Sequence, residues 1–491
     1  MLVHELILQG KTDDLAIVDG SKRITYKDLQ AKVKEYRNYF YHIGIRQGEN
    51  VGLLSRNSAE YIYTYMAIAS LGAVVVPINF QLSLREITYI VKDAEMKHII
   101  SYRSLDLNEN LLKQNFKQSL KQIIIKEIEE NDEKTTLGQA PLLPSDFSAE
   151  QTGVIIYTSG TTGNPKGAVL SHKNLTRNAE MLGEVIDVNR VDNVLCILPM
   201  YHCFAWTCAV LNPLLFGATI IILDSFNPKE TTLAIKQEQV SIIYAVPSIY
   251  SLLSRLAEAE DLASVRVVVS GGTTLPVKIA DDFTQKFGLP IMEGYGLSEA
   301  SPVVAVNPQN KVKVGSIGLA LPALKVKIVD ESGNSLPTGK IGELIVKGDN
   351  IMKGYFNLPQ ETSQVLKDEW LHTGDMAYQD EDGYIFIVDR LKDMFISMGE
   401  NIYPREVEEL LYAYPGIIEA AVVGVPDKLR GQSGVAFIVM AEGQSLNKRA
   451  MKEYLQSNLA LYKVPRDFKV MDSLPKSSTG KILKRELAKL D

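Results

Sequence analysis

The sequence predicts a mixed α/β protein with a large N-terminal domain, a β-rich subdomain and a small α+β domain at the C-terminus. Short apolar runs alternate with amphipathic helical patterns over most of the 491 residues, which is typical of α/β layering. Between residues 325 and 390 the pattern changes to short strands joined by glycine-containing turns. Beyond residue 390 a further set of strands and helices begins.

The predicted strands of the N-terminal domain are continuous apolar runs bounded by Gly, Pro or Asn. Such runs indicate strands covered on both faces, because a strand with one solvated face would alternate apolar and polar residues. In chain order they are AVVVPIN at 73–79, HIISY at 98–102, QIIIKE at 122–127, GVIIYTS at 153–159, and then NVLCILP, ATIIIL, VSIIYAVP and VRVVVSGG.

Two helix starts are marked by local chemistry. Ser83 and Glu86 form a capping box before LREITYIVKDA, since each side chain can accept a free N–H of the first turn. Pro404 suits the first position of a helix, where its missing N–H costs nothing. An apolar face then recurs at Val407, Leu410, Leu411 and Tyr414, so a compact helix is predicted there.

The β-rich subdomain is predicted from the runs KVKIVD, GELIVKG and DEDGYIFIVD. The runs EAAVVGVPD and SGVAFIVM, with helical segments of their own, belong to a separate unit. We therefore expect one domain at residues 1–390 and a second, smaller domain at residues 391–491.

The overall charge excludes two classes of protein. A net charge of −7 and a pI near 5.6 argue against a protein that coats nucleic acid or an anionic membrane, because both need excess Lys and Arg. Small molecules are the expected partners. The start MLVHELILQGKTDD lacks the basic region of a signal peptide, and no apolar window of about eighteen residues occurs. We expect no integral membrane segment and a cytoplasmic location.

Three cysteines, Cys196, Cys203 and Cys208, lie close together at spacings that match no usual zinc pattern. Their odd number does not form a closed set of disulfides. We expect buried thiols in a reducing compartment rather than metal ligands.

The stretch YTSGTTGNPKG at 157–167 follows a predicted strand and contains little that a core could bury. Glycines let the backbone approach a phosphate closely, and backbone N–H groups bind it without a counter-charge. The spacing differs from G-x-x-x-x-G-K-[ST], because Lys166 lies between Pro165 and Gly167. A solvated connecting loop is the alternative to a phosphate site. If the loop binds phosphate, Lys166 supplies positive charge and the hydroxyl donors are Thr158, Ser159, Thr161 and Thr162.

The longer stretch YTSGTTGNPKGAVLSH closely resembles the signature loop of the adenylate-forming superfamily, which includes acyl-CoA synthetases, peptide-synthetase adenylation domains and luciferases. Further motifs of that family follow in order. They are SGGTTLP at 270–276, EGYGLSEASP at 293–302, HTGDMAY at 372–378, DRLKDMFISMGENIYPREVE at 389–408 and PKSSTGKILKREL at 475–487. The resemblance therefore covers essentially the whole chain.

The resemblance implies a two-step reaction. ATP and a carboxylic acid give an acyl-adenylate and pyrophosphate, and the acyl group then passes to the thiol of CoA. The first step brings two anions together, so positioning and charge neutralisation should dominate catalysis. Lys481 matches the family's lysine that bridges the carboxylate and the α-phosphate. Lys166 would neutralise the polyphosphate, and Glu299 matches the carboxylate that holds Mg²⁺, a hard ion that prefers oxygen ligands.

The resemblance also implies contacts with the nucleotide. Tyr295 would stack on adenine, and Ser298 would lie near the α-phosphate. Asp375 would accept both ribose hydroxyls, which suits the two oxygens of a carboxylate. Arg390 would add a ribose or phosphate contact, and the edge of adenine would be lined by Gly272, Thr273 and Thr274.

Lys392 occupies the family's hinge position. The resemblance implies that a mobile C-terminal domain rotates about it, presenting Lys481 in one arrangement and segment 397–401 in the other. In the second arrangement the tunnel for the pantetheine of CoA would be lined by Ser397, Met398 and Gly399. Ile396 stands where luciferases and plant coumarate ligases carry a lysine, a departure that fits fatty acyl-CoA synthetases better.

The segment PMYHCFAW at 199–206 resembles the acyl-pocket motif of fatty acyl-CoA synthetases, and His202 matches a family histidine near the substrate carboxylate. An amino-acid substrate is disfavoured, since its ammonium group would be buried without a partner in an apolar pocket. An unbranched medium- or long-chain fatty acid is the expected substrate. Further residues expected to line the pocket are Tyr201, Trp206, Val246, Ala300 and Pro302.

Three alternatives stay open. The acid could be aromatic. The sequence also leaves the acyl chain length open, because residues far apart in the sequence close the pocket and each methylene contributes only about 0.8 kcal/mol. The acyl group could pass to a carrier protein instead of free CoA. A nucleotide-binding regulator without chemistry is the least favoured, because the residues that the reaction needs are all present, namely Lys166, Glu299, Asp375, Arg390 and Lys481.

Overall fold

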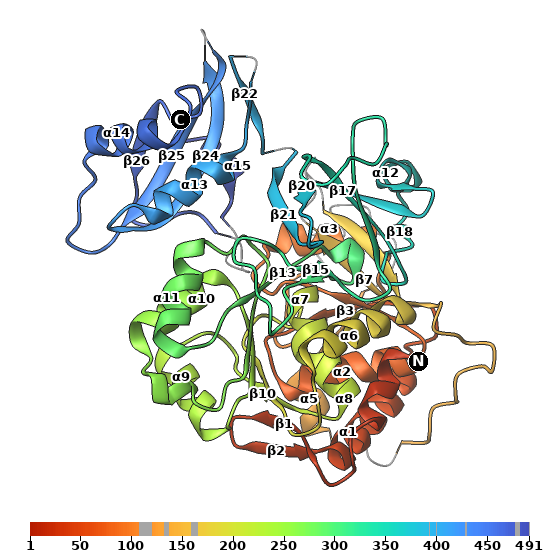
Figure 1. Ribbon diagram of the computed structural model, residues 1–491. Coiled ribbons are helices and arrows are strands. Elements are labelled where there is room, and N and C mark those ends of the chain that lie inside the picture. Colours follow the sequence, from red (N-terminus) through yellow and green to blue (C-terminus); the bar gives the residue numbers. More distant parts are fainter. Residues whose placement is uncertain are drawn as a thin grey trace.

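The computed structural model describes residues 1–107, 120–131, 137–158, 165–391, 393–398, 400–427, 430–476 and 482–490. They form a large N-terminal part and a smaller C-terminal domain (Figure 1). The predicted mixed α/β class with a large and a small domain is confirmed. The boundary after residue 390 stays a prediction; β21 ends at Arg390 and β22 begins at Phe395.

One large sheet has the strand order β15-β14-β13-β12-β11-β9-β10-β1-β2. Strands β1 and β9 to β13 run parallel, and antiparallel strands close both edges. Every residue of β10, β11 and β12 is buried, as the continuous apolar runs predicted. The strands are β1 (Leu15–Asp19), β2 (Lys22–Thr25), β9 (Asn193–Cys196), β10 (Thr219–Ile222), β11 (Ile242–Ala245), β12 (Val267–Ser270), β13 (Met292–Gly296), β14 (Val303–Val306) and β15 (Leu319–Ala320).

The second large sheet has the order β18-β8-β7-β4-β3-β5-β6. Its strands β3 to β7 are parallel, whereas β8 and β18 are antiparallel to their neighbours. The strands are β3 (Asn50–Leu54), β4 (Val74–Pro77), β5 (His98–Ser101), β6 (Lys121–Ile124), β7 (Thr152–Thr158), β8 (Lys166–Ser171) and β18 (Gly354–Tyr355).

Helices cover both faces of these two sheets (Figure 1). Helices α1, α2, α6 and α8 pack between the sheets and share one apolar core with both. Helices α9, α10 and α11 cover the outer face of the first sheet, and α3 covers the outer face of the second. The bounds are η1 (Val3–Leu8), α1 (Tyr26–His42), α2 (Ala59–Ser70), α3 (Leu84–Asp93), α5 (Ile125–Glu130), α6 (His172–Ile186), α7 (Cys203–Trp206), η3 (Thr207–Leu211), α8 (Asn212–Phe216), α9 (Pro228–Gln237), α10 (Pro247–Leu256), η4 (Ala259–Leu262), α11 (Val277–Phe287) and η5 (Ser298–Ala300).

Both predicted helix starts are confirmed. Glu86 N–H donates to Ser83 Oγ at 3.3 Å and Ser83 N–H donates to Glu86 Oε2 at 2.8 Å, so the capping box opens α3. Helix α13 (Pro404–Ala413) begins at the predicted proline. The predicted strand QIIIKE is wrong in its second half, because Ile125 begins α5. Lysine and glutamate residues follow it, and their helix propensity outweighs the short apolar run.

The β-rich stretch forms a sheet of order β16-β17-β20-β19, and β21 pairs with β20. Strand β18 comes between β17 and β19 in the chain but belongs to the second large sheet. It pairs there with β8, at Gly354 with Val169 and at Tyr355 with Ala168. The elements are β16 (Lys325–Val329), β17 (Gly342–Lys347), α12 (Pro359–Val365), β19 (Leu366–Lys367), β20 (Trp370–Gln379) and β21 (Ile385–Arg390).

The C-terminal domain has a sheet of order β23-β22-β25-β24, with β26 parallel to β25. Separate apolar cores lie on the two faces of this sheet. Its elements are β22 (Phe395–Ser397), β23 (Glu400–Ile402), α13, β24 (Ile417–Asp427), β25 (Gly431–Met440), α14 (Lys448–Asn458), β26 (Asp467–Val470) and α15 (Lys484–Ala488).

The three cysteines, Cys196, Cys203 and Cys208, are buried, as predicted. Burial raises the pKa of the Cys196 thiol to about 12 and that of Cys203 to about 11, so both are neutral thiols near pH 7. Within the described part of the chain, no helix is both long and apolar enough to cross a bilayer.

Candidate active site

Several motif segments begin at the carboxyl ends of the parallel strands in the first large sheet. Strands β12 and β13 are parallel neighbours, so segments 271–276 and 297–302, which follow them, start on the same side of the sheet. Open α/β sheets bind ligands at these strand ends. Strands β7 and β8 pair as a hairpin through Thr158 and Lys166, which brings both ends of the glycine-rich loop together. Within that loop, Ser159, Thr161 and Thr162 lie outside the described residues.

A buried carboxylate forms the first cluster of the site. Asp375 on β20 is 4% exposed. Its side chain accepts a hydrogen bond from the Tyr295 hydroxyl and forms an ion pair with Arg390, whose Nε lies 3.3 Å from Asp375 Oδ1. Asp375 and Arg390 are cross-strand partners in the β20–β21 pair, while Tyr295 comes from β13. Burial and the adjacent Asp375 raise the pKa of Tyr295 well above its usual value, so the phenol keeps its proton. Three residues from three motifs therefore meet at one carboxylate.

Hydrogen bonds from neighbouring residues fix the turn that precedes Asp375. Gly374 has a φ of 72°, in the region that favours glycine, and its N–H donates to Glu343 Oε1 at 3.0 Å. The other oxygen of Glu343 lies 2.7 Å from His372 Nδ1. Thr373 Oγ accepts from the Asp375 N–H at 3.1 Å. The backbone before Asp375 is thus held independently of any ligand.

A second cluster combines one carboxylate, one phenol and one ammonium group. Tyr355 donates to Glu299 Oε1 at 2.8 Å, and Lys166 Nζ lies 5.3 Å from the centre of the Tyr355 ring, within cation–π range. Burial and Glu299 raise the pKa of Tyr355, which keeps the phenol a hydrogen-bond donor. Sequence analysis missed Tyr355, because it lies outside the recognised motifs and reaches the site only through the pairing of β18 with β8.

The second cluster fits a Mg²⁺ ion held jointly with a polyphosphate. Mg²⁺ commonly takes one or two carboxylates and fills its remaining positions with phosphate oxygens and water. The described residues contain no group of three or more His, Cys, Asp and Glu side chains placed to hold a metal by themselves. Tyr355 binds one oxygen of Glu299, and the second oxygen is the one suited to a metal ion.

The loop after β12 lies beside this edge. Gly272 has a φ of 83°, and a Cβ there would lie 3.7 Å from Val246. Gly272 and Thr274 are exposed and Thr273 is partly exposed, so a flat ring can reach their backbone. Ser298 Oγ lies 3.3 Å from Cys203 Sγ, which ties the β13 motif to α7.

His202 sits at the start of α7 and lines a small apolar cavity. Its Nδ1 accepts from the Phe204 N–H at 3.2 Å, and it caps the helix. The cavity has a volume of about 10 Å³, the room that one water molecule needs, and is lined by Leu198, Pro199, His202, Phe204, Val246 and Gly272. Val246 lines this cavity, and its place in an acyl pocket stays a prediction. Trp206 instead packs in the core, with its ring 4.1 Å from that of Tyr65.

Other predicted residues are not brought to these clusters. Lys481, the hinge residue Lys392 and Gly399 lie outside the described residues. Ser397 is buried on β22, within the C-terminal domain. In Figure 1, β22 rises from the domain junction and leads away from β13 and β20. In this arrangement segment 397–398 is not part of the site.

Comparisons with known proteins decide the family. The model of the AMP-binding enzyme family matches residues 6–356, and that of the AMP-binding enzyme C-terminal domain matches residues 406–481. This chain belongs to the AMP-binding enzyme family. The resemblance to the adenylate-forming superfamily is thereby confirmed.

Members of this family match the chain along nearly its whole length. Feruloyl-CoA synthase from Amycolatopsis sp is 36% identical over 476 residues, covering 96% of this chain and 95% of that protein. A long-chain-fatty-acid–CoA ligase from Bacillus subtilis (strain 168) is 34% identical over an alignment of 536 residues, covering 99% and 95%. ATP-bound MatB from Rhodopseudomonas palustris gives a TM-score of 0.93 at 28% identity, covering 100% of this chain and 99% of MatB. Apo MatB, with the same coverage, gives 0.81.

Proposed function

We propose that this protein is an ATP-dependent carboxylic acid–CoA ligase that forms an acyl-adenylate and transfers the acyl group to CoA. The main support is the buried Asp375 carboxylate, which Tyr295 and Arg390 hold in an AMP-binding enzyme. We propose that its two oxygens accept the two hydroxyls of a ribose, a pairing that suits carboxylate geometry. Relatives named as CoA ligases match along nearly the whole chain, which supports the acceptor.

In the proposed first step, a carboxylate oxygen of the acid attacks the α-phosphorus of ATP. The bond from that phosphorus to the oxygen bridging to the β-phosphate breaks, and pyrophosphate leaves. Lys166 and Lys481 supply positive charge to the phosphates and to the attacking carboxylate, whose mutual repulsion opposes the reaction. A Mg²⁺ ion at Glu299 would neutralise further charge on the leaving pyrophosphate.

In the proposed second step, the sulfur of CoA attacks the acyl carbonyl carbon. The bond from that carbon to the phosphate oxygen breaks, and AMP leaves. Ser397, Met398 and Gly399 are proposed to line the path of the pantetheine. Because Met398 is 65% exposed in the present arrangement, this step requires the C-terminal domain to turn about Lys392.

We infer that the acid is apolar and carries a single carboxylate, since the cavity at His202 has mainly apolar walls. The motif at 199–206 favours a medium- or long-chain fatty acid. A compact aromatic acid is the second candidate. The cavity has the room of about one water molecule, so an acid of either kind requires side chains such as Phe204 to move. The relatives support both, since one is named a fatty-acid ligase and another a feruloyl-CoA synthase.

Pyrophosphate release measured over a series of acids tests this proposal. The series contains fatty acids of graded chain length, and benzoic and cinnamic acids with and without ring hydroxyls. A kcat/KM that rises with chain length supports the fatty acid, and a preference for ring acids supports the second candidate. Silence for all acids in both sets would contradict a ligase. Parallel assays with CoA and with a phosphopantetheinylated carrier protein identify the acceptor.

The variant Lys481→Ala tests the role of the lysine. Adenylate formation should fall by about a hundredfold or more, the usual effect of removing a group that stabilises charge in the transition state. Transfer from a supplied acyl-adenylate to CoA should persist. Lys476→Ala is the matched control, because Lys476 lies in the same motif and pairs with Glu419. Undiminished adenylate formation by Lys481→Ala would exclude the proposed role.

A further inference from the structure

Helix α13 of the C-terminal domain is anchored to the N-terminal domain through Arg405. This residue is 13% exposed, and its Nη1 donates to the Ile387 carbonyl of β21 at 2.6 Å. Its Nη2 lies 3.5 Å from the Gly315 carbonyl. Its backbone N–H donates to Asp389 Oδ2 at 3.0 Å. One arginine therefore binds two backbone carbonyls and one carboxylate across the domain junction.

At the same junction, each domain supplies a carboxylate that accepts an N–H at the start of a helix in the other domain. The first N–H groups of a helix lack partners inside the helix, and carboxylates are favourable there. Tyr403 gives α13 no side-chain cap, and Asp389 on β21 accepts an N–H of its first turn instead. Pro276 likewise gives α11 no side-chain cap, and Glu409 on α13 accepts the Val277 N–H at 3.4 Å. Each domain thus caps a helix of the other.

Buried acidic groups make Arg405 important at this junction. Glu409 Oε1 lies 3.8 Å from Arg405 Nε. Glu293 is 4% exposed on β13, faces both Arg405 and Glu409, and accepts the Leu275 N–H at 3.0 Å through one oxygen. Among the described residues, the second oxygen of Glu293 makes no hydrogen bond. Without Arg405, two neighbouring carboxyl groups would lose their compensating charge, which is costly for buried groups.

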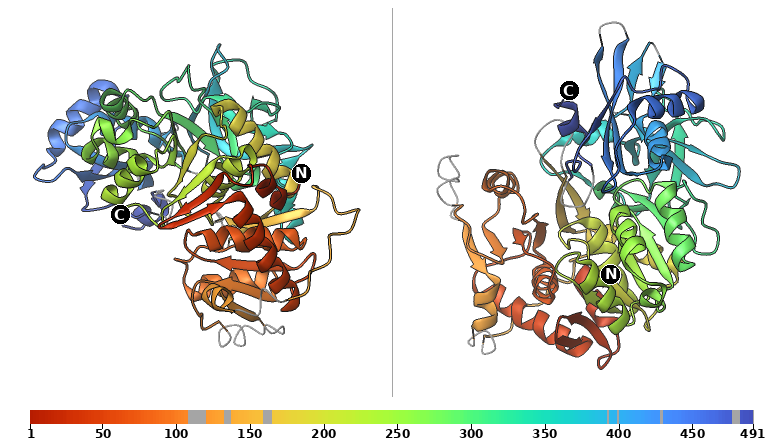
Figure 2. Two further views of the ribbon diagram at one scale, coloured as in Figure 1. Left: turned by 90° about the horizontal axis from the view of Figure 1, so that it is seen from below. Right: turned by 90° about the vertical axis from the view of Figure 1, so that its left-hand side faces the viewer.

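These contacts belong to one arrangement of the domains. They join residues up to 389 with residues from 405 onward, and the expected hinge Lys392 lies between them. Rotation about that hinge would separate α13 from β21 and α11, which lie side by side (Figures 1 and 2). Ile396 and Met398, on either side of the buried Ser397, face solvent in this arrangement and are 49% and 65% exposed. The whole chain also superposes better on ATP-bound than on apo MatB.

We propose that Arg405 and Glu409 are positioning residues that hold the C-terminal domain in the adenylate-forming arrangement. This inference rests on the proposed function, because it assigns the arrangement to the first of the two half-reactions. The two residues touch neither nucleotide nor acid. They act by stabilising the present arrangement, in which Met398 lies away from the candidate site.

Measuring the two half-reactions separately tests the proposal. Arg405→Gln and Glu409→Ala should slow pyrophosphate release from acid and ATP by tenfold or more. Transfer from a supplied acyl-adenylate to CoA should change less than twofold. Arg405→Lys keeps the charge but loses the planar two-nitrogen donor, so its loss should be intermediate. Arg449→Gln is the control, because Arg449 is 89% exposed on α14 of the same domain and pairs only at the surface with Glu453.

A distance measurement gives a second readout that a purely structural role would leave unchanged. Fluorophores at Val191→Cys and Leu461→Cys report on the domains, since these positions are 82% and 68% exposed and the native cysteines are buried. With ATP bound, Arg405→Gln should shift or broaden the distance distribution between the two domains. Equal loss of both half-reactions, or slow adenylation with an unchanged distribution, would overturn the proposal. A wild type that forms no acyl-adenylate contradicts the proposed function, while the distance distribution still tests the interdomain contact.

Discussion

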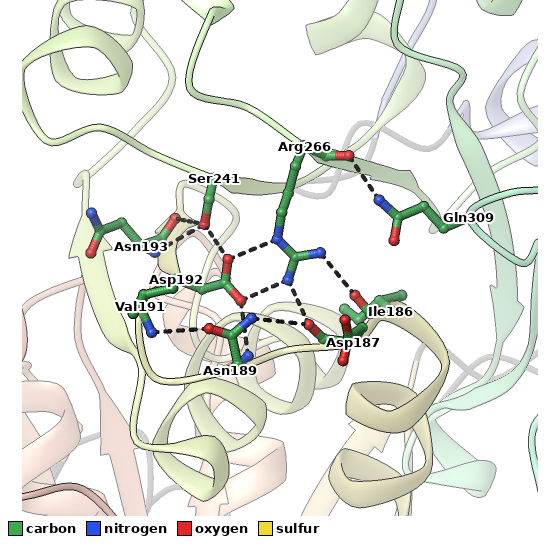
Figure 3. Close-up of polar contacts among 9 residues, drawn as sticks. All are labelled: Ile186, Asp187, Asn189, Val191, Asp192, Asn193, Ser241, Arg266 and Gln309. Atoms are coloured by element: carbon green, nitrogen blue, oxygen red, sulfur yellow. Dashed lines mark hydrogen bonds and ion pairs between the residues drawn. The ribbon is translucent and has the colours of Figure 1, made fainter.

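Replacing Asp192 by asparagine should lower the stability of the N-terminal domain and leave its chemistry intact. Asp192 is 2% exposed and accepts from Arg266 through Nε at 2.9 Å and Nη2 at 2.7 Å (Figure 3). It also accepts from Ser241 Oγ at 2.7 Å and from the Asn189 N–H at 2.9 Å. Asparagine keeps the size of the side chain but removes the charge that balances Arg266.

Arg266 links this carboxylate to the end of α6. It donates to the carbonyls of Ile186 at 3.2 Å and Asp187 at 2.7 Å, where the helix ends with Asp187 at a φ of 53° (Figure 3). The pair therefore fixes a helix C-terminus, whose carbonyls favour a cation. This cluster lies at the amino ends of strands in the first sheet, whereas the candidate site lies at their carboxyl ends. The residues that directly precede these strands are Asp192, Ser241 and Arg266.

Breaking a buried ion pair from one side typically costs about 3–5 kcal/mol. The lower end, about 3 kcal/mol, is expected here because the Arg266 side chain is 31% exposed and water can partly solvate it. Urea unfolding followed by fluorescence at pH 7 measures this loss. The kcat at 25 °C should stay within twofold of the wild type. A loss below about 1 kcal/mol, or a fall in kcat at unchanged stability, would refute the argument.

The ion pair of Asp192 with Arg266 also predicts that the stability of the protein depends on pH. Burial alone would raise the pKa of Asp192, but the hydrogen bonds from Arg266, Ser241 and Asn189 outweigh it and hold the pKa below its usual value. The stabilisation is therefore complete above the unfolded pKa of about 4 and is lost as the pH falls through the lower folded pKa. The stability difference between wild type and Asp192→Asn should shrink in that range.

Three further predictions concern other groups. Burial raises the pKa of Glu293 from 4.5 to about 7, so stability should fall as the pH rises through that window, and Glu293→Gln should recover up to about 3 kcal/mol at pH 8 in urea unfolding. Burial lowers the pKa of His172 from 6.5 to about 3, and its Nδ1 accepts the Val3 N–H. Acidifying from pH 7.5 to 5 should therefore lower the free energy of unfolding of the wild type by about 2 kcal/mol, and His172→Gln should not show this loss. Asp375→Asn should raise the KM for ATP by about tenfold, equal to about 1.4 kcal/mol, and change the KM for the acid less than threefold in pyrophosphate release.

Local sequence signals predicted the elements that depend on neighbouring residues. The box of Ser83 and Glu86 placed the start of α3, because both partners lie within one helical turn. The buried runs of β10 and β11 were visible because strands covered on both faces lack alternation. The strand prediction for QIIIKE is wrong after Ile124, because an apolar strand signal and a helix signal lie within the same six residues. The helix-forming residues after Ile125 outweigh the apolar run.

The sequence motifs named several members of each cluster but not how they meet. Tyr295, Asp375 and Arg390 belong to three recognised motifs, so their roles were proposed one by one. The structure shows the Asp375 carboxylate bound to Tyr295 by a hydrogen bond and to Arg390 by an ion pair. Tyr355 escaped notice, since a two-residue strand has no periodicity, and its pairing with Ala168 joins distant parts of the chain. Long-range pairing of this kind leaves no local signal.

Acyl specificity shows the same limit most clearly. The ring of Phe204 fills the space beside Gly271, where a Cβ would come within 2.9 Å of that ring, and it meets Tyr244 edge-on at 6.2 Å between ring centres. The motif at 199–206 predicts an acyl pocket, yet the room available there depends on how a glycine after β12 and a tyrosine on β11 pack around one aromatic side chain. In its present position the Phe204 ring lines the cavity beside His202, which has the room of about one water molecule. We therefore propose that packing between three separate segments sets the size of the acid, and each of these segments is ordinary core sequence when considered alone.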